Sequence, residues 1–278
     1  MRSLLFVPGD RPERFAKAAA TGADALILDL EDSVSAAHKS LGRDEIAKAL
    51  NGAPLGPKLF VRVNPLDSSY IDADLTALAG LRPDGIVLPK AEGATSVNAL
   101  TERLAKFDIA ASILPIATET PRALFHLGSY AELVTKLVGL TWGAEDLPAA
   151  IGAQTSREPD GRYTPPYEIA RALTLFAAHA AGVDAIETVY PDFRNLEGLS
   201  AYVARAARDG FTAMMAIHPS QVPIINAAFT PSDEALAQAR AIVQAFADNP
   251  GAGALQLGGK MIDAPHLKQA QKLLKRAG

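Results

Sequence analysis

The sequence predicts a (β/α)8 barrel followed by a small C-terminal extension. The chain has 278 residues, of which 49% are hydrophobic, so it can bury a large core within one α/β barrel. Short apolar runs recur eight times along it, with helix-like stretches between them. The runs are continuous and do not alternate with polar residues, as expected for parallel strands covered on both faces. Eight repeats of this kind favour a closed barrel over an open sheet.

The eight predicted strands recur at intervals that mostly suit one βα unit. They begin near Leu4, Ala25, Leu59, Gly85, Ser112, Leu137, Asp184 and Ala213. A glycine often precedes a strand, as expected where a helix ends in a left-handed cap. These glycines are Gly22, Gly85, Gly182 and Gly210.

The predicted helices fill the intervals between the strands. They cover Pro12–Thr21, Ala36–Asn51, Ala73–Leu81, Ser96–Lys106, Arg122–Leu133, Tyr167–Gly182, Leu196–Asp209 and Pro219–Ala228. Ser35 and Ser96 are predicted to be N-caps, because a serine oxygen accepts a bond from the first helical amides. The longest predicted loop runs from Gly143 to Pro166, and loops of that length are usually functional or mobile.

The C-terminal segment 231–278 is predicted as an appendage to a barrel domain of residues 1–230. A helix runs from Pro231-Ser-Asp to about Asp248, and a hairpin over 254–262 turns at Gly258-Gly259. An amphipathic helix over Pro265–Arg276 follows. Because this segment is too small to fold alone, we expect it to pack on the barrel or on a neighbouring subunit.

Composition excludes several functional classes. The net charge of −4, with both signs interspersed, predicts no binding of nucleic acid or anionic membranes. No apolar run is long enough to span a membrane, and the N-terminus is too short in apolar residues for a signal peptide. With no cysteine there are no disulfides, no thiolate metal sites and no cysteine nucleophile. We expect a cytoplasmic protein.

Two acidic turns are the strongest functional signal. Glu119 follows the fifth predicted strand and Asp146 follows the sixth. The carboxyl ends of neighbouring parallel strands meet at one end of a barrel, where a hard cation can bind both carboxylates. Arg62, near the end of the third strand, suits a carboxylate ligand. These residues predict a Mg²⁺-dependent enzyme acting on a small oxygen-rich acid, although Glu119 alone could be a charge favoured by a helix N-terminus.

Eight short motifs give the chain a specific resemblance. In order they are Arg2-Ser-Leu-Leu-Phe-Val-Pro-Gly-Asp, Asp29-Leu-Glu-Asp-Ser-Val, Val61-Arg-Val-Asn-Pro, Val87-Leu-Pro-Lys, Glu119-Thr-Pro, Trp142-Gly-Ala-Glu-Asp-Leu, Ala216-Ile-His-Pro-Ser-Gln and Gly259-Lys-Met-Ile-Asp. Across the whole chain they resemble the citrate lyase beta-subunit family, which belongs with the HpcH/HpaI aldolases and includes malyl-CoA and citramalyl-CoA lyases. The resemblance implies Mg²⁺-dependent cleavage of a 3-hydroxyacyl thioester of the citryl-, malyl- or citramalyl-CoA type. The products would be an acyl thioester and an α-keto acid such as oxaloacetate, glyoxylate or pyruvate.

The resemblance also implies roles for residues at the strand ends. Glu119 and Asp146 would be the metal ligands, and Arg62 would pair with the substrate carboxylate and stabilise charge on the keto oxygen. The substrate carboxylate would also contact the backbone amides of the turn formed by Gly143, Ala144 and Glu145. Asp29, Glu31 and Asp32 are candidates to support these groups, although Asp32 could equally serve as an acidic helix cap.

Three further residues have two readings each. Arg14 and Lys17, at the start of the first helix, could bind the phosphates of coenzyme A or form an ordinary solvated helix face. Asp263, after the hairpin, could be a helix N-cap. The resemblance instead implies that the C-terminal segment covers the active site of an adjacent subunit, where Asp263 would transfer the proton at the acyl carbon. That reading predicts a homo-oligomer, a trimer or a multiple of it.

Two alternatives stay open at this point. Lys90, at the end of the fourth strand, could act as a Schiff-base aldolase lysine, although nearby carboxylates would raise its pKa. The chain could also be a non-catalytic subunit of a citrate lyase-like complex. The sequence does not decide which of the acyl thioesters is cleaved, or whether it is carried by coenzyme A or by a carrier protein.

Overall fold

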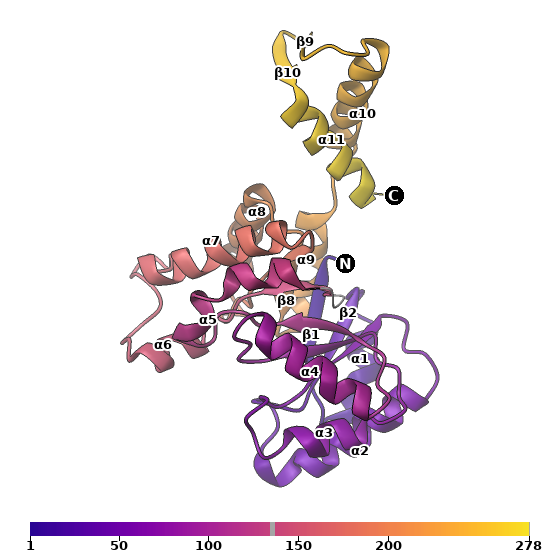
Figure 1. Ribbon diagram of the computed structural model, residues 1–278, viewed down its shortest axis with the longest axis vertical. Helices are drawn as coiled ribbons and strands as arrows, with labels where there is room; N and C mark the ends of the chain where they lie inside the picture. Colours follow the sequence, from indigo (N-terminus) through magenta and orange to yellow (C-terminus); the bar gives the residue numbers. More distant parts are fainter. Residues whose placement is uncertain (134–136, 278) are drawn as a thin grey trace. The chain divides into compact units, whose positions relative to one another are not determined.

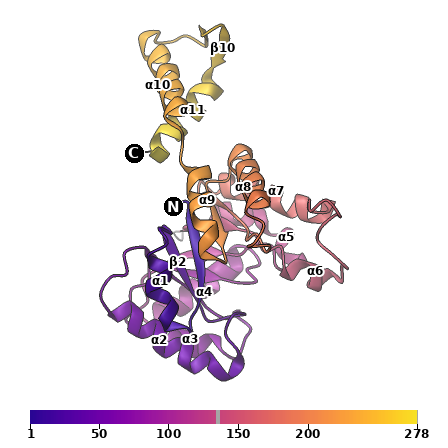
Figure 2. The same ribbon diagram turned by 180° about the vertical axis from the view of Figure 1, so that it is seen from behind.

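The computed structural model describes residues 1–133 and 137–277. The chain divides into two compact units, Met1–Ala227 and Ala228–Gly278. Figures 1 and 2 show the elements of both units from opposite sides. No helix of the described residues is both long and apolar enough to cross a membrane.

The first unit is the predicted eight-stranded parallel barrel. Its sheet has the order β5-β4-β3-β2-β1-β8-β7-β6. The strands are β1 (Ser3–Pro8), β2 (Ala25–Asp29), β3 (Lys58–Arg62), β4 (Gly85–Leu88), β5 (Ser112–Pro115), β6 (Gly139–Thr141), β7 (Asp184–Glu187) and β8 (Ala213–Ala216).

The barrel is completed between β5 and β6 by a seam without a continuous ladder among the described residues. Two isolated parallel bridges join the strands, Ile113 with Leu137 and Ile116 with Thr141. The amide of Val138 donates to Ile113 O (2.9 Å), and the amide of Ala117 donates to Thr141 O (2.8 Å). All eight strands are therefore neighbours in a ring, which confirms the predicted fold class.

Helices connect the strands and cover the outside of the barrel (Figure 1). The longer ones are α2 (Lys39–Asn51), α4 (Ala94–Lys106), α7 (Pro165–Ala180) and α8 (Leu196–Asp209), and the shorter ones are α1 (Phe15–Ala19), α3 (Ile71–Ala77), α5 (Pro121–Leu124), α6 (Asp146–Ile151) and α9 (Val222–Phe229). Four 3₁₀ turns accompany them: η1 (Pro12–Arg14), η2 (Ala36–His38), η3 (Leu127–Glu132) and η4 (Pro219–Gln221).

The single helix predicted over 122–133 is wrong, because α5 ends at Leu124 and the 3₁₀ turn η3 follows it. The turn brings two side chains onto the segment that precedes α4. Ser129 Oγ accepts from the amide of Ala94 (2.9 Å), and Tyr130 Oη accepts from that of Gly93 (3.2 Å). These tertiary hydrogen bonds outweigh the local preference for a continuous helix.

Two other local predictions are also corrected. Ser96 does not cap α4, which begins at Ala94 after Gly93 at φ 82°; its hydroxyl accepts from the amide of Glu92 instead. Ser35 precedes η2 but its side chain makes no capping bond. Of the glycines before strands, Gly85 has no left-handed backbone. It is required by packing, because an added Cβ would lie 2.3 Å from the ring of Phe60.

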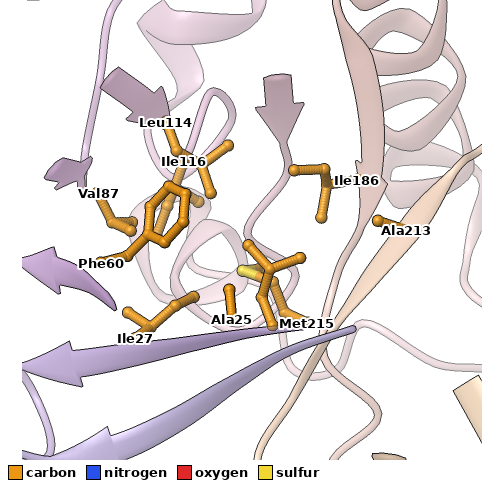
Figure 3. Packing of buried hydrophobic residues seen from close by; sticks show 10 residues of the cluster. Ala25, Ile27, Phe60, Val87, Leu114, Ile116, Ile186, Ala213 and Met215 are labelled. Carbon is orange, nitrogen blue, oxygen red and sulfur yellow. The ribbon is translucent and has the colours of Figure 1, made fainter. Parts of the chain in front are cut away.

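The core of the barrel is formed by inward-facing side chains from seven strands or their ends. Figure 3 shows Phe60, Ile27, Leu114 and Ile116 lying close together, with Met215 and Ala25 beside them. Every member of this cluster is at most 3% exposed. The interior is therefore packed, and ligand chemistry is confined to one end of the barrel.

The second unit consists of two helices and a hairpin. Helix α10 (Asp233–Asp248) is capped by the hydroxyl of Ser232, which accepts from the amide of Ala235 (3.2 Å). Strands β9 (Ala254–Leu257) and β10 (Lys260–Asp263) pair antiparallel, and α11 (Ala264–Ala277) follows. Gly258 and Gly259 both have positive φ, as a tight two-residue hairpin turn requires. Few side chains of this unit are buried, among them Ala239, Ile262 and Ala270.

Candidate functional site

A cavity of about 800 Å³ opens at the carboxyl ends of the barrel strands. Such ends hold the active sites of barrel enzymes. Its wall includes most of the site residues predicted in the first unit: Arg14, Lys17, Asp29, Arg62, Glu119, Gly143, Ala144, Glu145 and Asp146. These residues come from segments that are far apart in the sequence, and the barrel brings them to one place.

The guanidinium of Arg62 is held on one side by two acidic residues that follow β2. Its Nε and Nη2 donate to the two carboxylate oxygens of Asp29, each at 2.6 Å, and its Nη1 lies 2.9 Å from Glu31 Oε2. Burial alone would lower the pKa of Arg62. The charges of the Asp29 and Glu31 carboxylates raise it by more than that, so its pKa lies above the ordinary value and the guanidinium stays charged. Other N–H donors of the guanidinium remain for a ligand in the cavity that Arg62 lines.

Glu119 is a buried carboxyl in the cavity wall, only 4% exposed. Burial, and next the negative charge of Asp146, raise its pKa to about 8, although the amide of Lys90 donates to Glu119 Oε2 and opposes this. The two carboxyl groups line the same cavity, and the charge of Asp146 disfavours ionisation of Glu119. A bound cation would relieve this repulsion.

The amine of Lys90 contacts two carboxylates of the site, those of Glu31 and Asp146. Its Nζ lies 2.7 Å from Glu31 Oε1 and 3.4 Å from Asp146 Oδ1. Burial lowers the pKa of Lys90, but the hydrogen bond to Glu31 and the charges of Glu119 and Asp146 raise it overall. Its backbone has φ 51°, which is uncommon for a residue with a side chain. A Schiff-base lysine needs the opposite shift of pKa.

The turn after β6 packs directly on Glu119. A Cβ added at Gly143 would lie 2.4 Å from Glu119 Cγ, so only glycine fits here. The amide of Gly143 donates to Thr118 Oγ1 (3.1 Å), so this member of the predicted amide group already has a partner. Asp146 begins α6, a short helix inside the segment predicted as a loop.

The donor set fits a magnesium ion. Among the described residues no group of three or more His, Cys, Asp or Glu side chains could hold a metal. Mg²⁺, however, is commonly bound through one or two carboxylates and keeps water or substrate oxygens in its other positions. Glu119 and Asp146, two carboxylates that line one cavity and interact through their charges, have that composition.

Arg14 and Lys17 are exposed and also line the cavity. Arg14 lies in η1 and Lys17 in α1, directly after β1. The Arg14 guanidinium lies 3.9 Å from the Glu13 carboxylate, on the same turn. Both cations are therefore accessible to an anionic ligand that enters the cavity.

Asp263 belongs to the second unit, at the end of β10. Its carboxylate contacts His266 Nδ1, and its amide faces the same nitrogen at 3.2 Å. The side chain is 34% exposed. This local pairing orients the carboxylate at the start of α11.

One buried group next to the cavity escaped the sequence analysis. Trp142 is fully buried, and its indole N–H donates to Glu187, which in turn pairs with Arg171. Glu187 stands at a strand end and could be noted as a candidate. The pairing with Arg171, sixteen positions earlier on a helix, has no signal in the sequence.

Comparison with known proteins agrees with this geometry. Residues 2–219 match the family model described as HpcH/HpaI aldolase/citrate lyase. The citrate lyase subunit beta-like protein of Mycobacterium tuberculosis is 42% identical over 275 residues, covering 99% of this chain and 94% of the relative. L-malyl-CoA/beta-methylmalyl-CoA lyase of Cereibacter sphaeroides is 33% identical (99% and 94% covered), and mitochondrial citramalyl-CoA lyase of Rattus norvegicus is 32% identical (98% and 85%).

A solved structure resembles the chain over its full length. The protein CitE of M. tuberculosis, in complex with magnesium, acetoacetate and coenzyme A, has a TM-score of 0.82 and 40% identity, with 100% of this chain and 98% of that one covered. A further M. tuberculosis structure, a citrate lyase beta subunit complexed with oxaloacetate and magnesium, has a TM-score of 0.73 and 39% identity, with 83% and 97% covered. The barrel and the acidic cavity agree with these matches, and the matches show that the chain belongs to the HpcH/HpaI aldolase/citrate lyase family.

Proposed function

We propose that this chain is a Mg²⁺-dependent carbon–carbon lyase that cleaves a 3-hydroxyacyl thioester of coenzyme A into an acyl thioester and a keto acid. The observation that carries the proposal is that Glu119, Asp146 and Arg62 line one cavity, where the charge of Asp146 acts on Glu119. Relatives named as malyl-CoA and citramalyl-CoA lyases support the reaction class. A related structure that holds magnesium and coenzyme A supports the cofactor and the substrate class.

Cleavage must move one proton off oxygen and another onto carbon. The substrate hydroxyl gives its proton to a base in the site, the carbon–carbon bond breaks with its electron pair passing to the thioester fragment, and that enolate takes up a proton at carbon from an acid. Bound to Glu119 and Asp146, Mg²⁺ would act as a Lewis acid on the developing keto oxygen. The keto acid and the acyl thioester then leave, so atoms and charge balance.

Arg62 binds and orients the keto-acid half in this proposal. Its fixed position, with Asp29 and Glu31 on one side, leaves no rotamer search when a carboxylate enters. Its permanent charge also stabilises negative charge on the oxygen during bond breaking. The amides of Ala144 and Glu145, next to Gly143 in the cavity wall, donate to the same ligand.

The coenzyme A moiety is proposed to contact Arg14 and Lys17. Both are exposed cations at the cavity, and phosphate groups suit them. The net negative charge of the whole chain gives no general attraction for an anion, so these local cations matter. A cytoplasmic location is also part of the proposal, because acyl-CoA substrates occur inside cells.

Asp263 is proposed to deliver the proton at the acyl carbon of a neighbouring subunit, with the extension 231–278 acting as a lid on the barrel domain 1–230. Two observations support this proposal. Few side chains of the second unit are buried, so a partner surface would stabilise it, and the partly exposed carboxylate of Asp263 is held by His266. A homo-oligomer, a trimer or a multiple of it, is part of this proposal.

Mixing two inactive variants tests the shared site. Asp263→Ala subunits and Glu119→Ala subunits, exchanged under mild dissociating conditions, would regenerate sites that combine an intact barrel with an intact lid. Activity should return to a measurable fraction of wild type. Persistent inactivity after proven subunit exchange would mean that each chain supplies its own Asp263.

A substrate screen tests the reaction itself. Purified protein is offered citryl-CoA, malyl-CoA and citramalyl-CoA with Mg²⁺, and the released keto acid is measured. We expect turnover of at least one thioester that stops when EDTA is added and resumes with excess Mg²⁺. Failure with all three would favour a non-catalytic subunit, and turnover that persists in EDTA would remove the metal from the proposal.

A further inference from the structure

Trp142 is the single tryptophan of the chain, and it lies immediately before the acidic turn of the cavity. It is 0% exposed, although it follows the end of β6. The ring of Tyr163, from the long segment between α6 and α7, meets it edge to face with centroids 5.0 Å apart. A side chain of this size, fixed on several sides, defines the path of the backbone that follows it.

The polar edge of Trp142 is bound by a buried carboxylate. The indole N–H donates to Glu187 Oε1, and the amide of Thr188 donates to the same oxygen (3.0 Å). Glu187 is 0% exposed, at the end of β7. An indole N–H in a dry core needs an acceptor, so Glu187 selects this one orientation of the ring.

Glu187 is in turn held by a buried arginine. Arg171 Nε donates to Glu187 Oε2 (2.7 Å), and its Nη1 lies 2.7 Å from Asp209 Oδ2. The guanidinium also lies 4.7 Å from the centroid of the Phe211 ring. The Arg171 side chain is only 5% exposed, so the Glu187 carboxylate has a partner for its charge without solvent.

The position of Trp142 is transmitted directly to the cavity. Its neighbour Gly143 donates to Thr118 and packs on Glu119 with no room for a methyl group. Asp146 follows within the same turn. A shift of the indole ring would therefore act on the turn that packs on Glu119 and leads to Asp146.

We propose that Glu187 is a positioning residue for the cation site: by fixing Trp142 it sets the turn that carries Asp146 against Glu119. This inference rests on the proposed function, since it assigns the purpose of the contact to Mg²⁺ binding. A purely structural ion pair would instead contribute only to the free energy of unfolding. The two roles therefore differ in what a matched pair of variants does to metal affinity.

Glu187→Gln and Trp142→Phe test the contact from its two sides. The first removes the charge while keeping the size of the side chain, and the second keeps a buried ring but removes the donor. We expect each to weaken the binding of Mg²⁺ alone, measured by calorimetry, by about tenfold or more, as is typical when the outer partner of a metal site is changed. Glutamine has one acceptor oxygen where the carboxylate has two, so it cannot accept from both Trp142 and Arg171. The double variant should lose no more than the stronger single variant, because both changes act on the orientation of the indole ring.

Asp209→Asn is the matched control. It removes the other partner of Arg171 but leaves the contact between Glu187 and Trp142 in place. We expect a lowered Tm with Mg²⁺ affinity within about twofold of wild type, as expected for a change outside the positioning contact. The emission of Trp142 gives a second readout, whose Mg²⁺ midpoint should rise in Glu187→Gln and stay unchanged in Asp209→Asn.

The outcomes separate the two levels of the proposal. Wild-type protein that binds no Mg²⁺ overturns the proposed function and this inference with it. Wild-type binding that survives unchanged in a folded Glu187→Gln or Trp142→Phe variant overturns the positioning role alone. An equal loss of affinity in Asp209→Asn also overturns it, because the effect would then follow general destabilisation.

Discussion

The raised pKa of Glu119 makes the stability of the metal-free protein depend on pH. The native carboxyl has a pKa of about 8, against an ordinary value of 4.5. The native state therefore holds this proton more tightly than the unfolded state does. Its contribution to stability is fully present below about pH 4.5 and is lost as the pH rises through about 8.

The size of the effect follows from that interval. A shift of one pKa unit corresponds to about 1.4 kcal/mol, so the full interval sets an upper limit of about 5 kcal/mol. Between about pH 5 and pH 9 the free energy of unfolding should fall by about 4 kcal/mol through this group. Glu119→Gln keeps the volume of the side chain and removes the titration, so this variant should lack that part of the pH dependence.

Urea unfolding in EDTA, followed by the emission of Trp142, measures both proteins across this range. The informative quantity is the difference in unfolding free energy between Glu119→Gln and wild type, because titrations elsewhere in the chain cancel. The difference should grow in favour of the variant as the pH rises. Parallel curves for the two proteins would refute the raised pKa of Glu119, which burial and next the charge of Asp146 explain.

Three further predictions concern single side chains of the cavity. Gly143→Ala places a methyl group 2.4 Å from Glu119 Cγ, so it should cost about 1–3 kcal/mol of stability and most of the activity, as measured by urea unfolding and the thioester assay. Arg62→Lys loses the paired contact with Asp29, and we expect kcat/KM to fall about tenfold or more; a near-normal value would reject its carboxylate-binding role. Borohydride with substrate should leave Lys90 unmodified, because the neighbouring carboxylates keep its amine protonated. An adduct on Lys90 detected by mass spectrometry would restore the Schiff-base alternative.

The architecture was predictable because barrel strands carry a signal of their own. Continuous apolar runs such as that of β2 mark strands buried on both faces. Helix α8 was predicted with its observed bounds, since Gly210 at φ 113° ends it where a left-handed cap is needed. The break between α5 and η3 was not predictable, because it depends on hydrogen bonds from Ser129 and Tyr130 to a segment far away in the sequence.

The site also has a part that could be predicted from the sequence and a part that could not. Side chains at strand ends, among them Glu119, Asp146 and Arg62, could be found because the fold itself brings strand ends together. Their partners could not be assigned. That Arg62 is shared by Asp29 and Glu31, and not free, depends on side-chain geometry across two strands. The buried pairing of Glu187 with Arg171 is likewise a long-range contact without a local pattern.

The seam between β5 and β6 has a consequence for the dynamics of the barrel. Glu119 follows β5 and Asp146 follows β6, so the two residues lie on either side of the seam, which isolated bridges join among the described residues. A cation held by both residues would link the β5 and β6 sides of the seam and would reduce local opening of the barrel there. Exchange of the amide hydrogens of Ala117 and Val138, which cross the seam, would then slow when the cavity is filled, because opening of the seam would require release of the cation.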